Sequence, residues 1–157
     1  MTWKEFEAAA PALARAARTR LEATRIALLG TIRADGSPRI SPVEPYFTPE
    51  ELVFGAMAQS RKAGDLARDP RCVLHTAIID PNAGEPEFKL YGRAVEIAAR
   101  AGPAEAWWLS HPPDTARVFA LSIDHASSVA WALERAEMTV TRWSEKHGLV
   151  ESTHRYP

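Results

Sequence analysis

Three consecutive residues, Ser60, Arg61 and Lys62, place a hydroxyl and two cations where the sequence predicts the first turn of a helix. Unpaired backbone N–H groups and the helix dipole favour an anion at such a position. Arginine adds forked hydrogen bonds and lysine adds a point charge, so the three side chains together suit a phosphate group. Arg39, on a preceding strand, could close this phosphate receptor from the other side.

A plainer reading is that Ser60 only caps the helix and that the two cations are solvated. The three residues alone favour this reading. The order of the surrounding elements changes the balance, because a strand carrying Arg39 and a Ser-Pro-Val run is followed by an apolar strand and then by the Ser-Arg-Lys turn. That succession is specific enough to keep the phosphate hypothesis.

The elements around this segment predict a mostly β protein with flanking helices, in a single domain over residues 1–157. Thr2 and Glu5 have the spacing of a capping box at the start of a helical segment over 1–25, which Pro11 should kink or divide. Asp35-Gly36 between two apolar runs predicts a hairpin whose proline-rich second strand lies at an edge or is bulged.

The remaining pattern consists of short strands joined by turns and favours a barrel of six or more strands over a βαβ fold. We expect strands over 26–33, 38–47, from 52 onward, 71–79, 87–98, 118–123, 128–133 and 138–143, short helices over 60–68 and 101–110, a loop over 80–86, and a loosely ordered tail over 144–157.

The stretch from residue 34 to 76 resembles the flavin-binding split-barrel family that includes pyridoxamine 5'-phosphate oxidases. In that family an arginine-led strand and an apolar strand precede Ser-Arg-Lys-Ala at a helix start, and the helix ends in a pair such as Asp69-Pro70. Looser agreement continues over 88–94. The resemblance implies a homodimeric split β-barrel of six to eight strands that binds FMN between its subunits. The deazaflavin coenzyme F420 is an alternative cofactor, and haem is less favoured.

The resemblance also assigns roles by position. The basic side chains and the serine would hold the cofactor phosphate, the backbone of 40–43 would line the isoalloxazine ring, and the two small residues of the apolar strand would face the ribityl chain. The expected cofactor-binding set is Arg39, Ile40, Ser41, Pro42, Val43, Gly55, Ala56, Ser60, Arg61 and Lys62. The implied activity is hydride transfer to or from an unknown small molecule. The flavin carries that chemistry, so we nominate no catalytic side chain.

Three departures from the family pattern bear on the substrate. Glu44 stands where pyridoxamine phosphate oxidases have a lysine, and Glu87 aligns roughly with their flavin-contacting glutamine. The family's C-terminal arginine-bearing segment, which completes the pyridoxal phosphate site, has no visible match after Trp143. A carboxylate at position 44 would repel a phosphorylated substrate, so we do not expect a true pyridoxamine 5'-phosphate oxidase. A non-catalytic flavin or haem carrier, and a cofactor-free dimeric barrel, stay open as alternatives.

Composition excludes several other classes. The net charge of -1 gives no global field that would recruit nucleic acid or an anionic membrane, and no apolar run approaches the length of a membrane span. From the acidic residues near the N-terminus we expect no signal peptide, and the single cysteine, Cys72, fits the expectation of a reducing cytoplasm. The five histidines include no pair at i, i+4, so we expect no metal site, although His75 or His125 could be an axial ligand to haem.

Overall fold

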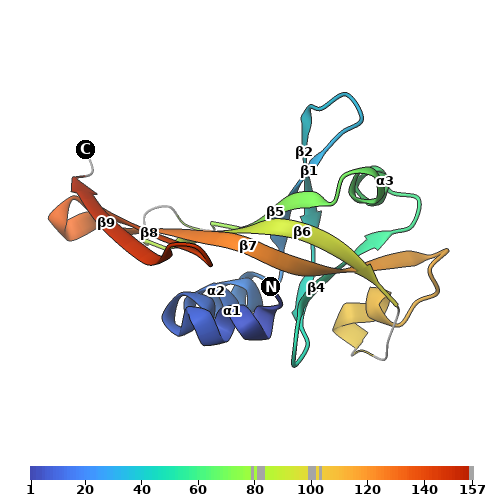
Figure 1. Ribbon diagram of the computed structural model, residues 1–157, viewed down its shortest axis with the longest axis horizontal. Coiled ribbons are helices and arrows are strands. Elements are labelled where there is room, and N and C mark those ends of the chain that lie inside the picture. The colour runs from blue at the N-terminus through green and yellow to red at the C-terminus, as the bar shows by residue number, and fades with distance from the viewer. Residues whose placement is uncertain (79, 81–83, 99–101, 103, 156–157) are drawn as a thin grey trace.

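One antiparallel sheet dominates the fold (Figure 1). Seven strands follow one another in the order β2-β1-β5-β6-β7-β4-β3, and β8 and β9 continue from β7. The computed structural model describes residues 1–78, 80, 84–98, 102 and 104–155, without the side chains of 104 and 105. Its elements are α1 (Trp3–Ala9), α2 (Pro11–Thr24), β1 (Ala27–Ile32), β2 (Pro38–Val43), β3 (Pro45–Phe47), β4 (Leu52–Met57), α3 (Arg61–Arg68), β5 (Arg71–Thr76), β6 (Glu87–Ile97), the 3-10 helix η2 (Ala104–Leu109), β7 (Ala116–Ala132), the 3-10 turn η3 (Leu133–Arg135), β8 (Glu137–Ser144) and β9 (Gly148–Arg155).

The sheet rolls up because β2 and β3 lie at its two opposite edges, although only Glu44 separates them in the chain. Two edges joined by one residue must come together, and β2 does contact β4. The sequence predicted one strand over 38–47, but the structure breaks it at Glu44 into two edge strands. The prolines Pro38, Pro42 and Pro45 are compatible with such positions because an edge strand leaves backbone N–H groups unpaired. The result is a split β-barrel, as the sequence predicted.

The two faces of the sheet carry different side chains. Leu29, Leu74 and Leu90 are cross-strand neighbours on β1, β5 and β6, and all three are buried on the inner face. One step along, Gly30, Val73 and Tyr91 form the corresponding row on the outer face. The period of two along each strand therefore separates a barrel interior from an outer surface.

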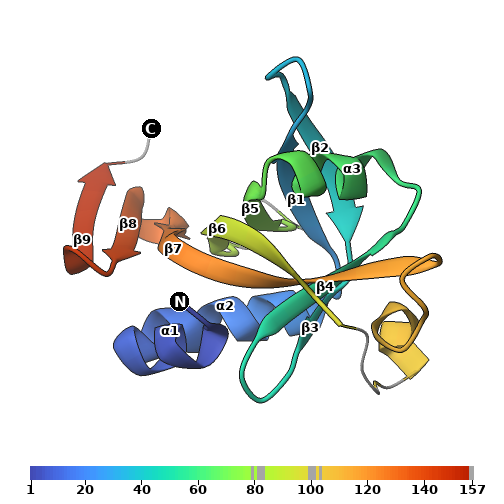
Figure 2. The same cartoon turned by 45° about the vertical axis from the view of Figure 1, so that its right-hand side comes forward.

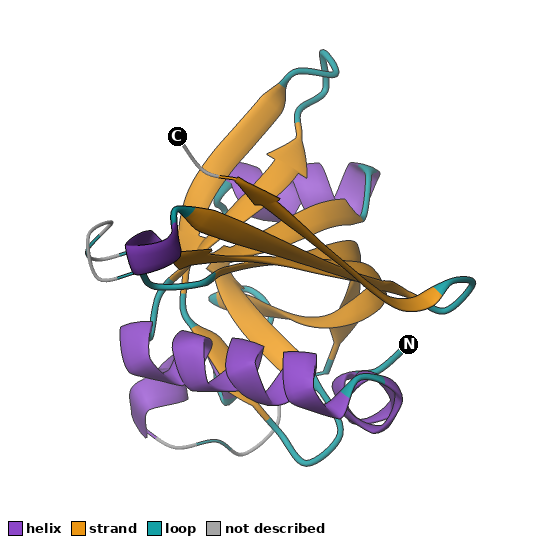
Figure 3. Cartoon of the chain, turned by 90° about the vertical axis from the view of Figure 1, so that its left-hand side faces the viewer, coloured by secondary structure: helices purple, strands orange, loops and turns teal. Residues whose placement is uncertain are grey.

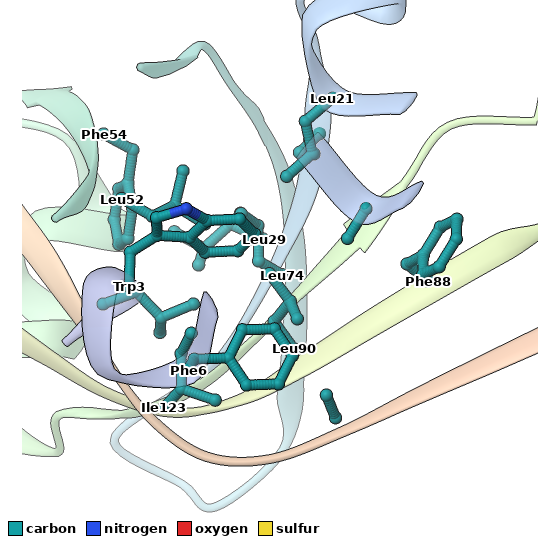
Figure 4. Close-up of a cluster of buried hydrophobic side chains, with 14 of the residues drawn as sticks. Trp3, Phe6, Leu21, Leu29, Leu52, Phe54, Leu74, Phe88, Leu90 and Ile123 are labelled. Atoms are coloured by element: carbon teal, nitrogen blue, oxygen red, sulfur yellow. The ribbon is translucent and has the colours of Figure 1, made fainter. Parts of the chain in front are cut away.

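Helices α1 and α2 pack along the interior side of the barrel (Figure 3). The predicted capping box of Thr2 and Glu5 starts α1, and Pro11 begins α2, so the division at this proline is confirmed. Trp3 and Phe6 are fully buried and lie among the leucines of β1, β4, β5 and β6 (Figure 4). Burial of two large aromatic side chains makes the N-terminal segment part of the core.

Some predicted boundaries were wrong. The strands expected over 118–123 and 128–133 are one continuous strand, β7, which a bulge opposite Tyr91 and Gly92 allows to bend. The tail over 144–157 is not loosely ordered throughout, because β9 pairs with β8 along its whole length through backbone hydrogen bonds that need no apolar pattern. Strand β5 ends at Thr76 rather than at 79, which lies outside the described residues together with 81–83, 99–101, 103, 156 and 157.

Substitution by alanine should have opposite effects on stability at Gly92, beside the bulge, and at Gly64, on α3. A Cβ at Gly92 would lie 1.9 Å from the backbone oxygen of Ser122, whereas a Cβ at Gly64 of α3 would meet nothing within 4 Å. Gly92→Ala should therefore lower the free energy of unfolding by about 1–3 kcal/mol. Gly64→Ala should raise it by roughly 0.5–1 kcal/mol, the difference in helix propensity. Urea unfolding measures both, and equal effects would contradict the close backbone approach.

Candidate functional site

A groove opens where the barrel is split. One side is formed by Pro42, Val43 and Glu44, at the end of β2, and the other side by Gly55 to Met57 on β4. Because β2 and β4 are not hydrogen-bonded partners, the space between them is not filled by a ladder. Ile26 and Lys62 complete the groove together with two tryptophans of η2. The sequence predicted that the ends of these two strands form one site, and the structure brings them together.

Lys62 is the cation of this groove. It lies in the first turn of α3, is half-buried, and its Nζ donates a hydrogen bond of 2.8 Å to the carbonyl oxygen of Pro42. Burial lowers the pKa of Lys62, and the charge of Glu44 opposes that shift. No carboxylate of the described residues lies within salt-bridge distance of its Nζ. An incompletely paired ammonium beside an apolar groove is a suitable contact for an anion.

Arg61 does not share this groove with Lys62. It is exposed and lies on a neighbouring depression whose wall also includes Arg33, Arg39 and Arg68. Successive residues of a helix point about 100° apart, which separates the two cations predicted to act together. These four arginines define what we call the arginine depression, which is lined by residues of α3 and of the β1–β2 hairpin. Helix α3 lies beside β1 and β2 (Figure 2).

The other predicted site residues take different positions. Ser60 is the N-cap of α3, and its hydroxyl oxygen accepts a hydrogen bond of 3.3 Å from the backbone N–H of Ala63. The hydroxyl proton remains able to donate to a ligand. Ile40 and Ser41 belong to β2 but are not part of the groove wall, and Ile40 is 72% exposed on the outer face. Pro42, Val43, Gly55, Ala56 and Lys62 are thus the members of the predicted set that share the groove.

Sequence reasoning missed Asp65, although it binds Arg39. Asp65 is 4% exposed, and its Oδ2 accepts hydrogen bonds from Arg39 Nε at 2.6 Å and from Thr31 Oγ1 at 3.0 Å. Its Oδ1 accepts a bond of 3.3 Å from Arg68. Arg39 was expected to reach across to the phosphate, but the structure commits its Nε to this buried carboxylate. The signal in the sequence was a hydroxyl, Thr31, inside an otherwise apolar strand.

Two tryptophans wall the end of the groove. Trp108 is buried against Gly55, where a Cβ would lie 2.4 Å from the indole ring, so only glycine lets the ring pack there. Trp107 stays partly exposed and stacks edge-on against His111. Both indoles line the groove, and Trp108 also belongs to a buried hydrophobic cluster.

Other reactive groups do not add to the site. Burial raises the pKa of the Cys72 thiol to about 12, so this cysteine is a poor nucleophile at neutral pH. Among the described residues, no cluster of three or more histidine, cysteine or acidic side chains could hold a metal ion. None of the helices in that part of the chain combines the length and hydrophobicity needed to cross a membrane.

The Asp65 network predicts a loss of stability in acid. Burial raises the pKa of Asp65, but the hydrogen bonds from Arg39, Thr31 and Arg68 together bring it below the usual 3.8. A carboxyl whose pKa is lower in the folded state stabilises the fold above its unfolded pKa, and this contribution is lost as the pH falls through the folded pKa. The wild type should therefore have a higher free energy of unfolding than Asp65→Asn at neutral pH, and this difference should become smaller below about pH 4. Denaturant titrations measure it, and a difference that stays the same from pH 7 to pH 2 would contradict the prediction.

Solved structures share the fold. A pyridoxamine 5'-phosphate oxidase-related, FMN-binding protein from Nostoc punctiforme is 13% identical, with 93% of this chain and 96% of that one covered and a TM-score of 0.65. PhzG from Burkholderia lata, in complex with tetrahydrophenazine-1-carboxylic acid, is 14% identical over 92% and 89% of the chains, with a TM-score of 0.64. A haem-binding protein from Mycobacterium smegmatis is 15% identical over 92% and 88%, with a TM-score of 0.57.

Sequence comparison gives a sharper result than the shared fold. No curated protein matches the chain in sequence. The model of the pyridoxamine 5'-phosphate oxidase family, however, matches residues 13–144, which include the whole groove, α3 and the buried Asp65. The chain therefore belongs to the pyridoxamine 5'-phosphate oxidase family.

Proposed function

We propose that the protein binds FMN in the groove at the split of the barrel and acts as an oxidoreductase on a small molecule. The observation that carries this proposal is Lys62, a half-buried ammonium at a mostly apolar groove. Glu44 lies on the same groove wall, but no carboxylate of the described residues is within salt-bridge distance of the Lys62 Nζ. The family supports a flavin as the ligand, and the Nostoc punctiforme relative of the same fold is FMN-binding.

The residues present suit this cofactor. Lys62 would pair with the phosphate, and the hydroxyl of Ser60 would donate to it at the N-terminus of α3. The apolar walls, Pro42 and Val43 on one side and Gly55 and Ala56 on the other, would face the rest of the molecule. The bound flavin would supply the transfer of a hydride, and the protein would contribute binding, orientation and exclusion of water. A deazaflavin has the same need for an anion site, so it stays a second choice of cofactor.

A second copy of the chain would complete the site. The groove offers about 290 Å³, which is just below the usual range for small-molecule sites. The adjacent outer face of β2 and β1 carries the exposed apolar side chains of Ile40 and Leu28, and Ile26, directly before β1, is exposed as well. Two such faces packed together would bury this patch and raise a second wall over the groove. We therefore propose a homodimer.

A non-catalytic haem carrier is the second candidate. It is favoured by the fold shared with the haem-binding protein from Mycobacterium smegmatis and by His125, an exposed residue stacked on Tyr91. His75 suits an axial ligand less, because its Nδ1 lies 2.6 Å from the carbonyl oxygen of Thr76 and its Nε2 lies 3.5 Å from Glu87. A Soret band after addition of hemin, without NAD(P)H oxidation by flavin-loaded protein, would favour the carrier.

The proposed contact between Lys62 and the FMN phosphate can be tested by substitution. Lys62→Ala should weaken FMN binding by about 1.5–3 kcal/mol, the weight of a charge-assisted hydrogen bond. This corresponds to a roughly 10- to 150-fold higher dissociation constant, measured by quenching of flavin fluorescence. Lys4→Ala, which removes a lysine paired with Glu50 outside the groove, is the matched control and should bind as the wild type does. Equal binding by all three proteins would refute the assigned phosphate contact.

The second prediction concerns the dimer. Light scattering should give the wild type twice the 17.3 kDa mass of the chain. Ile40→Asp should shift the protein towards the monomer, because it would bury a charge in the interface. Leu149→Asp changes another exposed apolar residue, which lies on β9, and should leave the dimer intact. A monomeric wild type would exclude a site shared by two subunits.

A further inference from the structure

Asp65 links α3 to both strands of the β1–β2 hairpin. Its carboxylate accepts hydrogen bonds from Thr31 on β1 at 3.0 Å and from Arg39 on β2 at 2.6 Å. These two donors are direct cross-strand partners, so they reach the same oxygen from neighbouring strands. Arg68 bonds the other oxygen at 3.3 Å and also donates to the carbonyl oxygen of Ile32 at 2.6 Å. One buried charge therefore holds a helix against two strands.

The same two elements, α3 and β2, also carry the proposed phosphate contact. Lys62 precedes Asp65 by three residues on α3, and its Nζ bonds the carbonyl oxygen of Pro42, three residues after Arg39 on β2. A helix of two turns moves as one body, so a change in its anchorage at Asp65 displaces Lys62 as well. A buried carboxylate that loses its partners is strongly disfavoured, which keeps the anchorage in one arrangement.

We propose that Asp65 is a positioning residue that fixes α3 on β2 and thereby enables the site to distinguish FMN from its unphosphorylated analogue, riboflavin. This inference rests on the proposed function. It assigns the selectivity for a phosphate to a negatively charged residue that does not itself line the groove.

Charge and position predict opposite results when Asp65 is neutralised. Asp65→Asn removes one negative charge next to the arginine depression, where Arg39 and Arg68 would gain a larger effective positive charge. If only charge mattered, the anionic FMN would bind more tightly. If Asp65 positions Lys62, FMN would bind more weakly, and riboflavin, which lacks the phosphate, would be almost unaffected.

The test is to measure the dissociation constants of FMN and riboflavin for the full-length wild type, Asp65→Asn and Asp69→Asn. Asp69 is the matched control, because it caps the C-terminal end of α3, away from Lys62, and its carboxylate pairs with Arg71. We expect Asp65→Asn to reduce the preference for FMN over riboflavin roughly tenfold through weaker FMN binding, the weight of a misplaced charged hydrogen bond. Asp69→Asn should keep the wild-type preference.

Several results would overturn the proposal. Unchanged or tighter FMN binding by Asp65→Asn would mean that the carboxylate acts as a charge alone, and a parallel loss of both affinities would mean a merely structural role. If Asp65→Asn does not fold, Thr31→Val removes one of its hydrogen bonds; a smaller loss of the same preference supports the proposal, and an unchanged preference contradicts it. A wild type without preference for FMN defeats the proposed phosphate site itself.

Discussion

The structure depends on one constraint of the chain path: Glu44 alone connects two strands that lie at opposite edges of the sheet. Two Cα–Cα steps join Val43 to Pro45 and span at most about 7 Å, so the edges must meet and the sheet must close into a barrel. The closure is incomplete, because β2 and β4 come into contact without pairing, and the groove is the space that this leaves. The proposed cofactor site is therefore a consequence of topology, and side chains of α3 and η2 only complete it.

Charge in this protein is organised locally. The net charge is -1, yet the two turns of α3 carry a partly desolvated lysine, two arginines and one buried carboxylate, and the adjacent β1–β2 hairpin adds two more arginines. Low dielectric on the buried side strengthens each of these interactions compared with the surface. Asp65 fixes the position of the helix, and Lys62 is left with a backbone carbonyl as its hydrogen-bond partner. This division between a structural ion pair and an available cation is what makes an anion site credible here.

Local signals predicted much of this from the sequence. The capping box at Thr2, the break at Pro11, the Asp35-Gly36 hairpin and the cap at Ser60 each depend on residues within a few positions of one another. Features that depend on distant pairing were not predictable. The continuity of β7 depends on a bulge against β6, and β9 is ordered by the backbone of β8 rather than by its own composition.

The site shows the same division between local and distant information. The meeting of the strand ends at the groove followed from the family pattern. For Asp65 the sequence offered only the hydroxyl of Thr31 in an apolar strand, and its binding to Thr31 and Arg39 together depends on the register that makes these two residues neighbours. The separation of Arg61 from Lys62 could have been predicted, because the 100° step of a helix already places adjacent side chains on different faces.

The most direct test of this account is a crystal structure of the protein grown with FMN. The account predicts that the flavin lies in the groove between β2 and β4, with its phosphate in hydrogen-bonding contact with the Nζ of Lys62 at the first turn of α3. A structure in which FMN binds elsewhere, or in which its phosphate lies away from Lys62, would contradict it.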